Sequence, residues 1–151
     1  MTTLRSITAA PSAARQGVVV AAWAYLIGMT IHASDHLYRG LTGDDMHSSW
    51  PGWLQVALSV VAVGLPVATL LYVRAGRTGA AALSTVVGLG SAGVFFALHV
   101  LPSWGPFTDS FVDPQSGAQV NWYAWVTAAI GIGGSLWLGI SGLVLLRRPG
   151  R

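Results

Sequence analysis

The stretch WYAWVTAAIGIGGSLWLGISGLVLL, from Trp122 to Leu146, contains no charged side chain. A helix needs about 20 apolar residues to cross the ~30 Å hydrocarbon core of a bilayer, and this stretch is long enough to do so. Three further apolar runs precede it, at about residues 17–34, 53–73 and 79–101. The sequence therefore predicts an all-α integral membrane protein, a four-helix transmembrane bundle forming a single domain over residues 1–151.

The composition points to the same class. Of the 151 residues, 53% are hydrophobic and 9% are charged, whereas soluble domains carry roughly 25% charged residues. So few charges cannot cover a soluble surface, which excludes an ordinary soluble enzyme. The net charge is +3, but the basic residues form no stripe, so we expect lipid and not nucleic acid as the partner. The chain has no cysteine, which excludes disulfides, thiolate ligands and covalent c-type haem.

Arginine is distributed unevenly between the two ends of the predicted helices. Seven of the eight basic residues lie in the N-terminal tail, the short link at 74–77 and the C-terminal tail, and only Arg39 lies elsewhere. All five aspartates lie in or beside the two longer connections, at about residues 36–52 and 102–121. Arginine favours the cytoplasmic side. We therefore expect both termini in the cytoplasm (N-in/C-in) and two longer, acidic and aromatic loops outside.

Small residues recur at steps of four along three of the runs. They are Ala24 and Gly28, then Ser84, Gly88 and Ala92, then Gly131, Ser135 and Gly139, with Gly142 on the same face. Helices in lipid approach closely where small side chains line the contact, so these faces should point into the bundle. Three histidines continue two of the stripes and should point inward as well. In the second run, Pro66 predicts a kink because proline lacks an N–H and crowds the preceding turn.

Those histidines belong to the densest group of reactive side chains, His32-Ala-Ser-Asp-His-Leu-Tyr-Arg39. Positions 32, 35, 36 and 39 share one helix face, and histidines at i and i+4 can bind one ion from successive turns. His99 reaches a similar depth from another helix. Three imidazoles suit Zn, Cu or Fe better than Mg or Ca. We interpret His32, His36 and His99 as candidate metal ligands, with a structural polar network as the alternative.

Two aspartates and one arginine accompany the histidines. Asp35 is spaced for an ion pair with Arg39, or for service as a ligand or as the partner of an imidazole N–H. For Asp109 the alternatives are a metal ligand, the partner of an imidazole N–H, or the cap of a turn after Pro102. A b-type haem held by His99 together with His36 or His32 is a further alternative. We rank it below a single ion because haem would leave one of the three histidines without a role.

Tryptophan gathers on the same side of the predicted bundle. Five of the seven tryptophans lie there, and we expect them to form an aromatic lid over the site: Trp50, Trp53, Trp104, Trp122 and Trp125. An interfacial aromatic belt is the alternative, although belts form at both faces of a membrane. Whether such a lid covers a quinone, a lipid or only its own backbone stays open. His47, in the first outer loop, should be solvated.

Two short motifs carry a resemblance. Asp35-His36-x-x-Arg39-Gly40 and His99-x-x-Pro102-x-Trp104 resemble elements of a loosely defined group of small four-span membrane proteins from high-GC Gram-positive bacteria. The resemblance covers the four-span layout and these motifs. It implies a multi-pass protein of the bacterial cytoplasmic membrane and supports the candidate site residues. The group has no assigned activity, so the resemblance implies none.

Three functions compete. The first is a membrane metal or haem protein with an outward-facing site, serving metal handling or electron transfer. The second is a non-catalytic accessory or structural subunit of a larger membrane complex, or of a homo-oligomer. The third, a small transporter, ranks last because no charged residue lies in the middle of a run and ion-coupled paths need such groups. No nucleophile motif or phosphate loop is present, so the question of enzymatic activity stays open.

Overall fold

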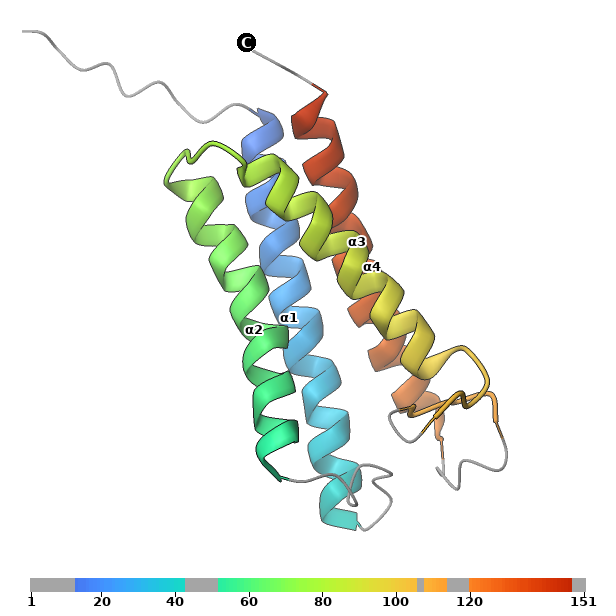
Figure 1. Ribbon diagram of the computed structural model, residues 1–151. Helices are drawn as coiled ribbons and strands as arrows, with labels where there is room; N and C mark the ends of the chain where they lie inside the picture. The colour runs from blue at the N-terminus through green and yellow to red at the C-terminus, as the bar shows by residue number, and fades with distance from the viewer. Residues whose placement is uncertain (1–12, 43–51, 106–107, 114–119, 148–151) are drawn as a thin grey trace, which may run out of the picture.

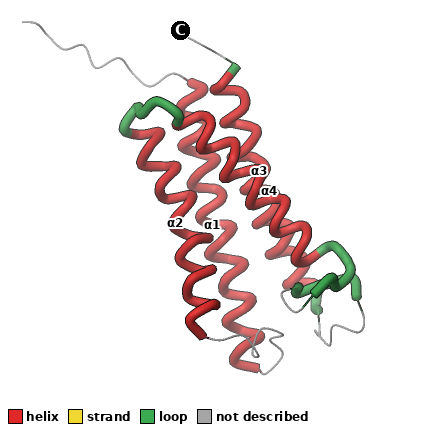
Figure 2. Tube along the Cα trace, in the orientation of Figure 1, coloured by secondary structure: helices red, strands yellow, loops and turns green. Residues whose placement is uncertain are grey.

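The computed structural model describes residues 13–42, 52–105, 108–113 and 120–147. These residues form four α-helices and, within the described ranges, no strand (Figure 1; Figure 2). Each helix is long and apolar enough to cross a membrane, which confirms the predicted all-helical architecture of a multi-pass membrane protein. In chain order they are α1 (Ala13–Thr42), α2 (Gly52–Arg74), α3 (Ala80–His99) and α4 (Trp122–Leu146).

The first helix is longer than the apolar run from which it was predicted. The run ends at about residue 34, but α1 continues for two further turns to Thr42. Asp35 and Arg39, which lie beyond that run, are buried on this extension and form an ion pair across one helical turn. Because the Arg39 guanidinium is paired inside the protein, the helix does not need to end where the apolar residues end.

Helix α4 holds the bundle together by packing against both α1 and α3. Helix α2 packs against α1. It also packs against α3, near the turn that joins α2 to α3. In that turn Gly76 and Gly79 have φ angles of 63° and 83°, a conformation that glycine adopts at little cost. Glycine therefore allows α2 and α3 to be joined by only five residues, 75–79.

The contact between α3 and α4 confirms the predicted packing by small residues. A Cβ atom on Gly88 would collide with the backbone of Gly139, and one on Gly142 would lie 2.6 Å from the amide nitrogen of Thr85. On α1, a Cβ on Gly28 would lie 3.1 Å from the carbonyl oxygen of Ile130. The stripes predicted for these helices are buried, apart from the half-buried Ala24: Gly28, Ser84, Gly88, Ala92, Gly131, Ser135, Gly139 and Gly142.

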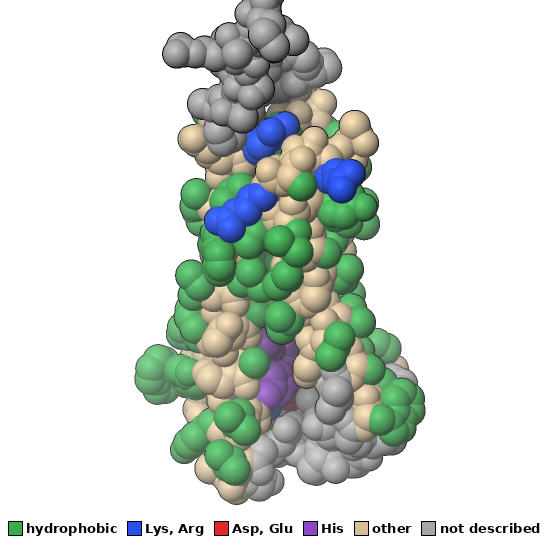
Figure 3. All heavy atoms as spheres, turned by 90° about the vertical axis from the view of Figure 1, so that its left-hand side faces the viewer, with side chains coloured by type: hydrophobic (Ala, Val, Ile, Leu, Met, Phe, Trp, Pro, Cys, Tyr) green, Lys and Arg blue, Asp and Glu red, His purple; other side chains and the backbone are tan. Residues whose placement is uncertain are grey.

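The two ends of the bundle differ in the basic side chains that they carry. Helix α1 begins and α4 ends beside the turn between α2 and α3 (Figure 1). Arginine side chains gather at this end, seen in blue in Figure 3, and we call it the arginine end. It carries every described arginine except Arg39, namely Arg15, Arg74, Arg77 and Arg147. The opposite end, where α1 and α3 finish, is the histidine end. Which end faces the cytoplasm stays a prediction.

Among the α2 side chains whose burial is described, the buried ones lie in the second half of the helix. Pro66, Thr69, Leu70 and Val73 are buried there. Every side chain of the first half whose burial is described, from Trp53 to Leu65, is exposed or half-buried. Pro66 lies within an uninterrupted helix, and the kink expected there stays a prediction. Large apolar side chains cover the flanks of the molecule, shown in green in Figure 3, as a surface facing lipid requires.

Candidate metal centre

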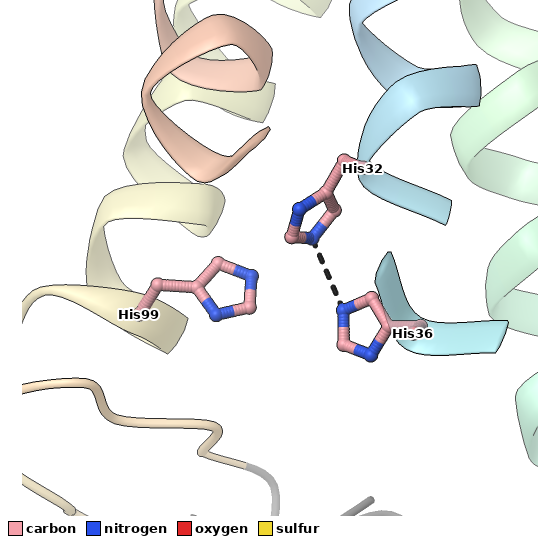
Figure 4. Close-up of side chains that lie close together, drawn as sticks. All are labelled: His32, His36 and His99. Atoms are coloured by element: carbon pink, nitrogen blue, oxygen red, sulfur yellow. Dashed lines mark hydrogen bonds between the residues drawn. The ribbon is translucent and has the colours of Figure 1, made fainter. Parts of the chain in front are cut away.

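Three imidazoles from two helices meet at the histidine end. His32 and His36 lie on successive turns of α1, and His99 is the last residue of α3 (Figure 4). One nitrogen from each ring lies within 4.8 Å of the other two. The Nε2 atoms of His32 and His36 are 3.1 Å apart, and the ring centroids of His32 and His99 are 4.8 Å apart. The three side chains are thus close enough to share one ion.

The loop after α3 folds back and fixes the position of His99. The amide of Asp109 donates to the carbonyl of Leu98 at 3.1 Å, and the amide of Phe111 donates to the carbonyl of His99 at 2.8 Å. The Ser110 hydroxyl donates to the carbonyl of Leu101 at 2.6 Å. The last carbonyls of a helix have no partner within the helix. This loop supplies partners to that end of α3 and brings Asp109 beneath the histidines.

Backbone and hydroxyl oxygens orient two of the rings. The Nδ1 atom of His99 lies 3.1 Å from the backbone oxygen of Asp109. Because a carbonyl only accepts, Nδ1 carries the proton and the lone pair of the neutral ring lies on Nε2. His32 Nδ1 lies 3.5 Å from Thr127 Oγ1, whose hydroxyl donates to the Ala124 carbonyl at 3.0 Å. Metal-binding histidines are typically held in this way, by an N–H bond to an oxygen behind the ring.

His36 has a different proton arrangement. Its Nδ1 atom lies 3.4 Å from Nη2 of Arg39. Guanidinium only donates, so this contact places the His36 lone pair on Nδ1 and its proton on Nε2. The Nε2–H group then donates to Nε2 of His32, the bond drawn in Figure 4. An ion bound between these nitrogens would replace that hydrogen bond and move or release the proton.

Arg39 connects the two ligand-bearing helices beneath the imidazoles. Its Nη1 and Nη2 atoms donate to Oδ1 and Oδ2 of Asp109 at 3.1 and 2.6 Å. Its Nε atom donates to Asp35 Oδ2 at 3.1 Å. The arginine is 1% exposed and both aspartates are fully buried. One guanidinium thus bonds two carboxylates, so the three side chains carry a formal charge of −1. This group lies beside the imidazoles, where negative charge is compatible with a bound cation.

Asp109 remains ionised although it is buried. Burial by itself would raise the pKa of Asp109, but the hydrogen bonds and the charge of Arg39, helped by His99 and His36, hold this pKa below its usual value. Its Oδ2 atom lies 3.5 Å from His99 Nδ1 and 4.0 Å from His36 Nε2. Both carboxylate oxygens already accept bonds from Arg39. The geometry therefore suits Asp109 as a partner that holds the histidines in place more than as a direct ligand.

Four of the five tryptophans expected in a lid are described. Trp53, Trp104 and Trp122 are exposed by 71%, 57% and 76%. Trp125 packs edge-on against Phe111, with ring centroids 5.3 Å apart, and Phe111 in turn lies 4.8 Å from His99. Exposed indole rings at helix ends also suit the membrane interface, so the lid stays a prediction. Trp50 and His47 lie outside the described residues.

Two features of the site were not predicted from the sequence. The paired hydrogen bonds between Arg39 and Asp109 join residues 70 positions apart, and the contact of Thr127 with His32 spans 95 positions. No local pattern signals either one. For the Arg39–Asp109 bonds, the sequence did offer one signal. All the aspartates and Arg39 lie near the same end of the predicted spans.

No protein-family model, curated protein or solved structure matches this chain. The chemistry of the histidine end is therefore the basis for a functional proposal.

Proposed function

We propose that the protein is an integral membrane metalloprotein in which His32, His36 and His99 bind one transition-metal ion of the Zn, Cu or Fe class, for metal handling or electron transfer. The observation that carries this proposal is the convergence of three imidazole nitrogens, from α1 and α3, within 4.8 Å. Imidazole is a common ligand of these metals and a poor one for Mg or Ca. The net negative charge of the Asp35–Arg39–Asp109 group supports a cation at this place.

The packing of the rings favours a single ion over a b-type haem. A haem requires its two axial imidazoles on opposite faces of a flat macrocycle. Here His32 and His36 are directly hydrogen-bonded, and Phe95 packs against His32 with ring centroids 5.1 Å apart. A macrocycle would have to separate these side chains, whereas an ion of about 2 Å bond length would need only small shifts.

A structural role is the second candidate, in an accessory subunit of a larger membrane complex or in a homo-oligomer. The observation that favours it is the connected hydrogen bonding of Arg39, which links α1 to the loop after α3 without any ion. Buried polar networks of connected hydrogen bonds can specify one arrangement of a core. Metal binding separates the two candidates, because a purely structural network has no need of an ion.

The placement of the site in the cell is part of the proposal. We infer a single transmembrane domain in the bacterial cytoplasmic membrane, in contact with the lipid bilayer. Both termini then lie in the cytoplasm and the histidine end faces outward. The support is the arginine bias, with Arg74 and Arg77 at the end opposite the histidines. The chain lacks cysteine, so a single cysteine at Arg77 should react only with reagent on the cytoplasmic side.

The decisive experiment measures metal in the purified protein. The full chain, in detergent, is loaded with Zn²⁺, Co²⁺ or Cu²⁺, passed over a desalting column and analysed for bound metal, and an absorbance scan reports any haem. We expect about one ion per chain. His99→Ala should abolish binding because His99 is the ligand that α3 supplies. His47→Ala removes a histidine outside the proposed set and should keep the ion. Absence of metal and haem from all three proteins would refute the proposal.

A further inference from the structure

Helices α2 and α3 diverge along one flank of the bundle. They are joined by the short turn at the arginine end and separate toward the histidine end (Figure 1). Among the α2 side chains whose burial is described, those that are buried lie from Pro66 onward. In the half nearer the histidines, α2 thus stands apart from α3, which carries His99.

Leu58, in the half of α2 nearer the histidines, is only partly covered by the described residues. Ala62, half-buried against the core, and the buried Pro66 and Leu70 form the face of α2 that turns toward the bundle. Leu58 lies one turn before Ala62 on the same side, yet it is 46% exposed. A large apolar side chain on the inward side of a helix is therefore accessible from the flank.

The histidines are reached from that flank. In Figure 3, which looks from the side where α2 lies, imidazole side chains (purple) are visible in a recess bordered by apolar side chains (green) and by backbone and other atoms (tan). The His36 side chain is 26% exposed, whereas residues His32 and His99 are 4% and 2% exposed. From the end of the bundle, Thr108, Asp109 and Ser110 lie over the network and are themselves buried. We call this recess the lateral window.

We propose that the lateral window admits a lipid-soluble molecule, with an apolar body and one oxygen or nitrogen donor atom, to the open side of the ion held by the three histidines. This inference rests on the proposed function for the ion. A recess that opens on the lipid-facing flank beside Leu58 selects a molecule that partitions into lipid. A metal held by three protein ligands keeps a fourth position for an exogenous group, and imidazole atoms are exposed at the window.

The test uses Co²⁺ as a coloured substitute in the full chain, reconstituted in lipid nanodiscs. The probes are 1-dodecylimidazole, which partitions into lipid, and 1-methylimidazole, which stays largely in water. We expect the dodecyl probe to shift the visible Co²⁺ absorption and the methyl probe at equal total concentration to leave it unchanged. An equal response to both probes would mean that the ion is reached from water and would overturn the inference.

A matched pair of variants separates the window from simple membrane partitioning. Leu58→Trp narrows the window, whereas Val60→Trp adds the same ring at a position 65% exposed, turned away from the inward side of α2. We expect Leu58→Trp to raise the half-saturating mole fraction of 1-dodecylimidazole about tenfold, and Val60→Trp to change it less than about twofold. Equal curves for the two variants would refute the window.

A metal-independent measurement keeps the two proposals distinguishable. If Co²⁺ gives no absorption band in the protein alone, the proposed metal function fails. The window is then tested with a dodecyl diazirine probe in the nanodisc, followed by peptide mapping. Labelling around His36 and Leu58 that is suppressed by Leu58→Trp but not by Val60→Trp would uphold the window. Uniform labelling of all lipid-facing helices would reject it.

Discussion

The two ends of the bundle are held together by different forces. Toward the arginine end, α3 and α4 touch through glycine, with Gly88 against the backbone of Gly139. At the histidine end, a buried ion network joins α1 to the loop after α3, and Arg39 is its centre. Lipid offers helices no hydrophobic drive to associate. The comparison shows two solutions to that problem, close van der Waals packing of backbones and charge pairing with directed hydrogen bonds.

The glycine contact serves stability alone, whereas the ion network also offers chemically reactive groups. Close glycine packing leaves no room for a ligand and offers no reactive atom. The ion network, in contrast, carries a net negative charge and positions imidazoles at its edge. Ionisable groups inside a membrane protein are costly and tend to mark functional sites. We therefore expect substitutions at the two ends to differ in kind as well as in size.

Loss of Arg39 should have the largest effect. Arg39→Met leaves two buried carboxylates without their shared cation, and removal of one partner from a buried ion pair costs about 3–5 kcal/mol. Thermal unfolding of the protein in detergent measures the loss, and metal binding should fall with it. Arg77→Met removes an exposed arginine at the other end and should change stability by less than about 0.5 kcal/mol. The triple variant with Asp35→Asn and Asp109→Asn should recover part of the stability, and no recovery would argue against the charge explanation.

Crowding at the glycine contact should come next. Gly88→Ala places a Cβ against the backbone of Gly139, and overpacking of this kind costs about 1–3 kcal/mol. The control is Gly90→Ala on the same helix, where a Cβ meets nothing within 4 Å. Thermal unfolding in detergent should separate the two variants. Metal stoichiometry should stay near that of the wild type in the folded fraction. Equal stabilities of the two variants would contradict the proposed packing role.

Acid should release the ion before it disrupts the ion network. Imidazole must be neutral to bind metal, so occupancy should fall as the pH drops from about 6 to 5. The pKa of Asp109 is lowered in the folded protein. Its contribution to stability is therefore complete above the unfolded-state value of about 3.9 and is lost only as the pH falls below it, through the folded-state value. Metal content and circular dichroism over one pH series test this order, and simultaneous loss at pH 5 would contradict it.

The smallest effect should follow from the oxygen behind His32. Thr127→Val keeps the shape of the side chain but removes the acceptor 3.5 Å from His32 Nδ1. Loss of such a partner weakens metal binding about tenfold, while the fold should lose no more than about 1 kcal/mol. Thr69→Val is the control, since Thr69 is also buried and bonds a backbone oxygen, that of Leu65. A competitive Co²⁺ titration that shows equal affinities would remove Thr127 from the site.

Part of the candidate site could be predicted from local sequence patterns. The i, i+4 spacing of His32 and His36 and the matching depth of His99 follow from helix geometry alone. The structure indeed brings all three together. The extension of α1 through Arg39 could not be read from hydropathy, because it depends on Asp109 arriving from a distant loop. The exposure of Leu58 could not be predicted either, since the hydropathy of an apolar residue in a span is the same whether the residue faces lipid, a helix or the lateral window.

Sequence alone thus determined the number of helices, their apolar character and the small-residue faces along which α3 and α4 meet. These properties depend on composition and on the 3.6-residue period, both of which are local. Tertiary structure alone decided which carboxylate bonds Arg39, which oxygen orients each imidazole, and where α2 leaves the bundle. These features depend on contacts between residues 70 or 95 positions apart, and such contacts are set by the packing of whole helices and the course of one loop.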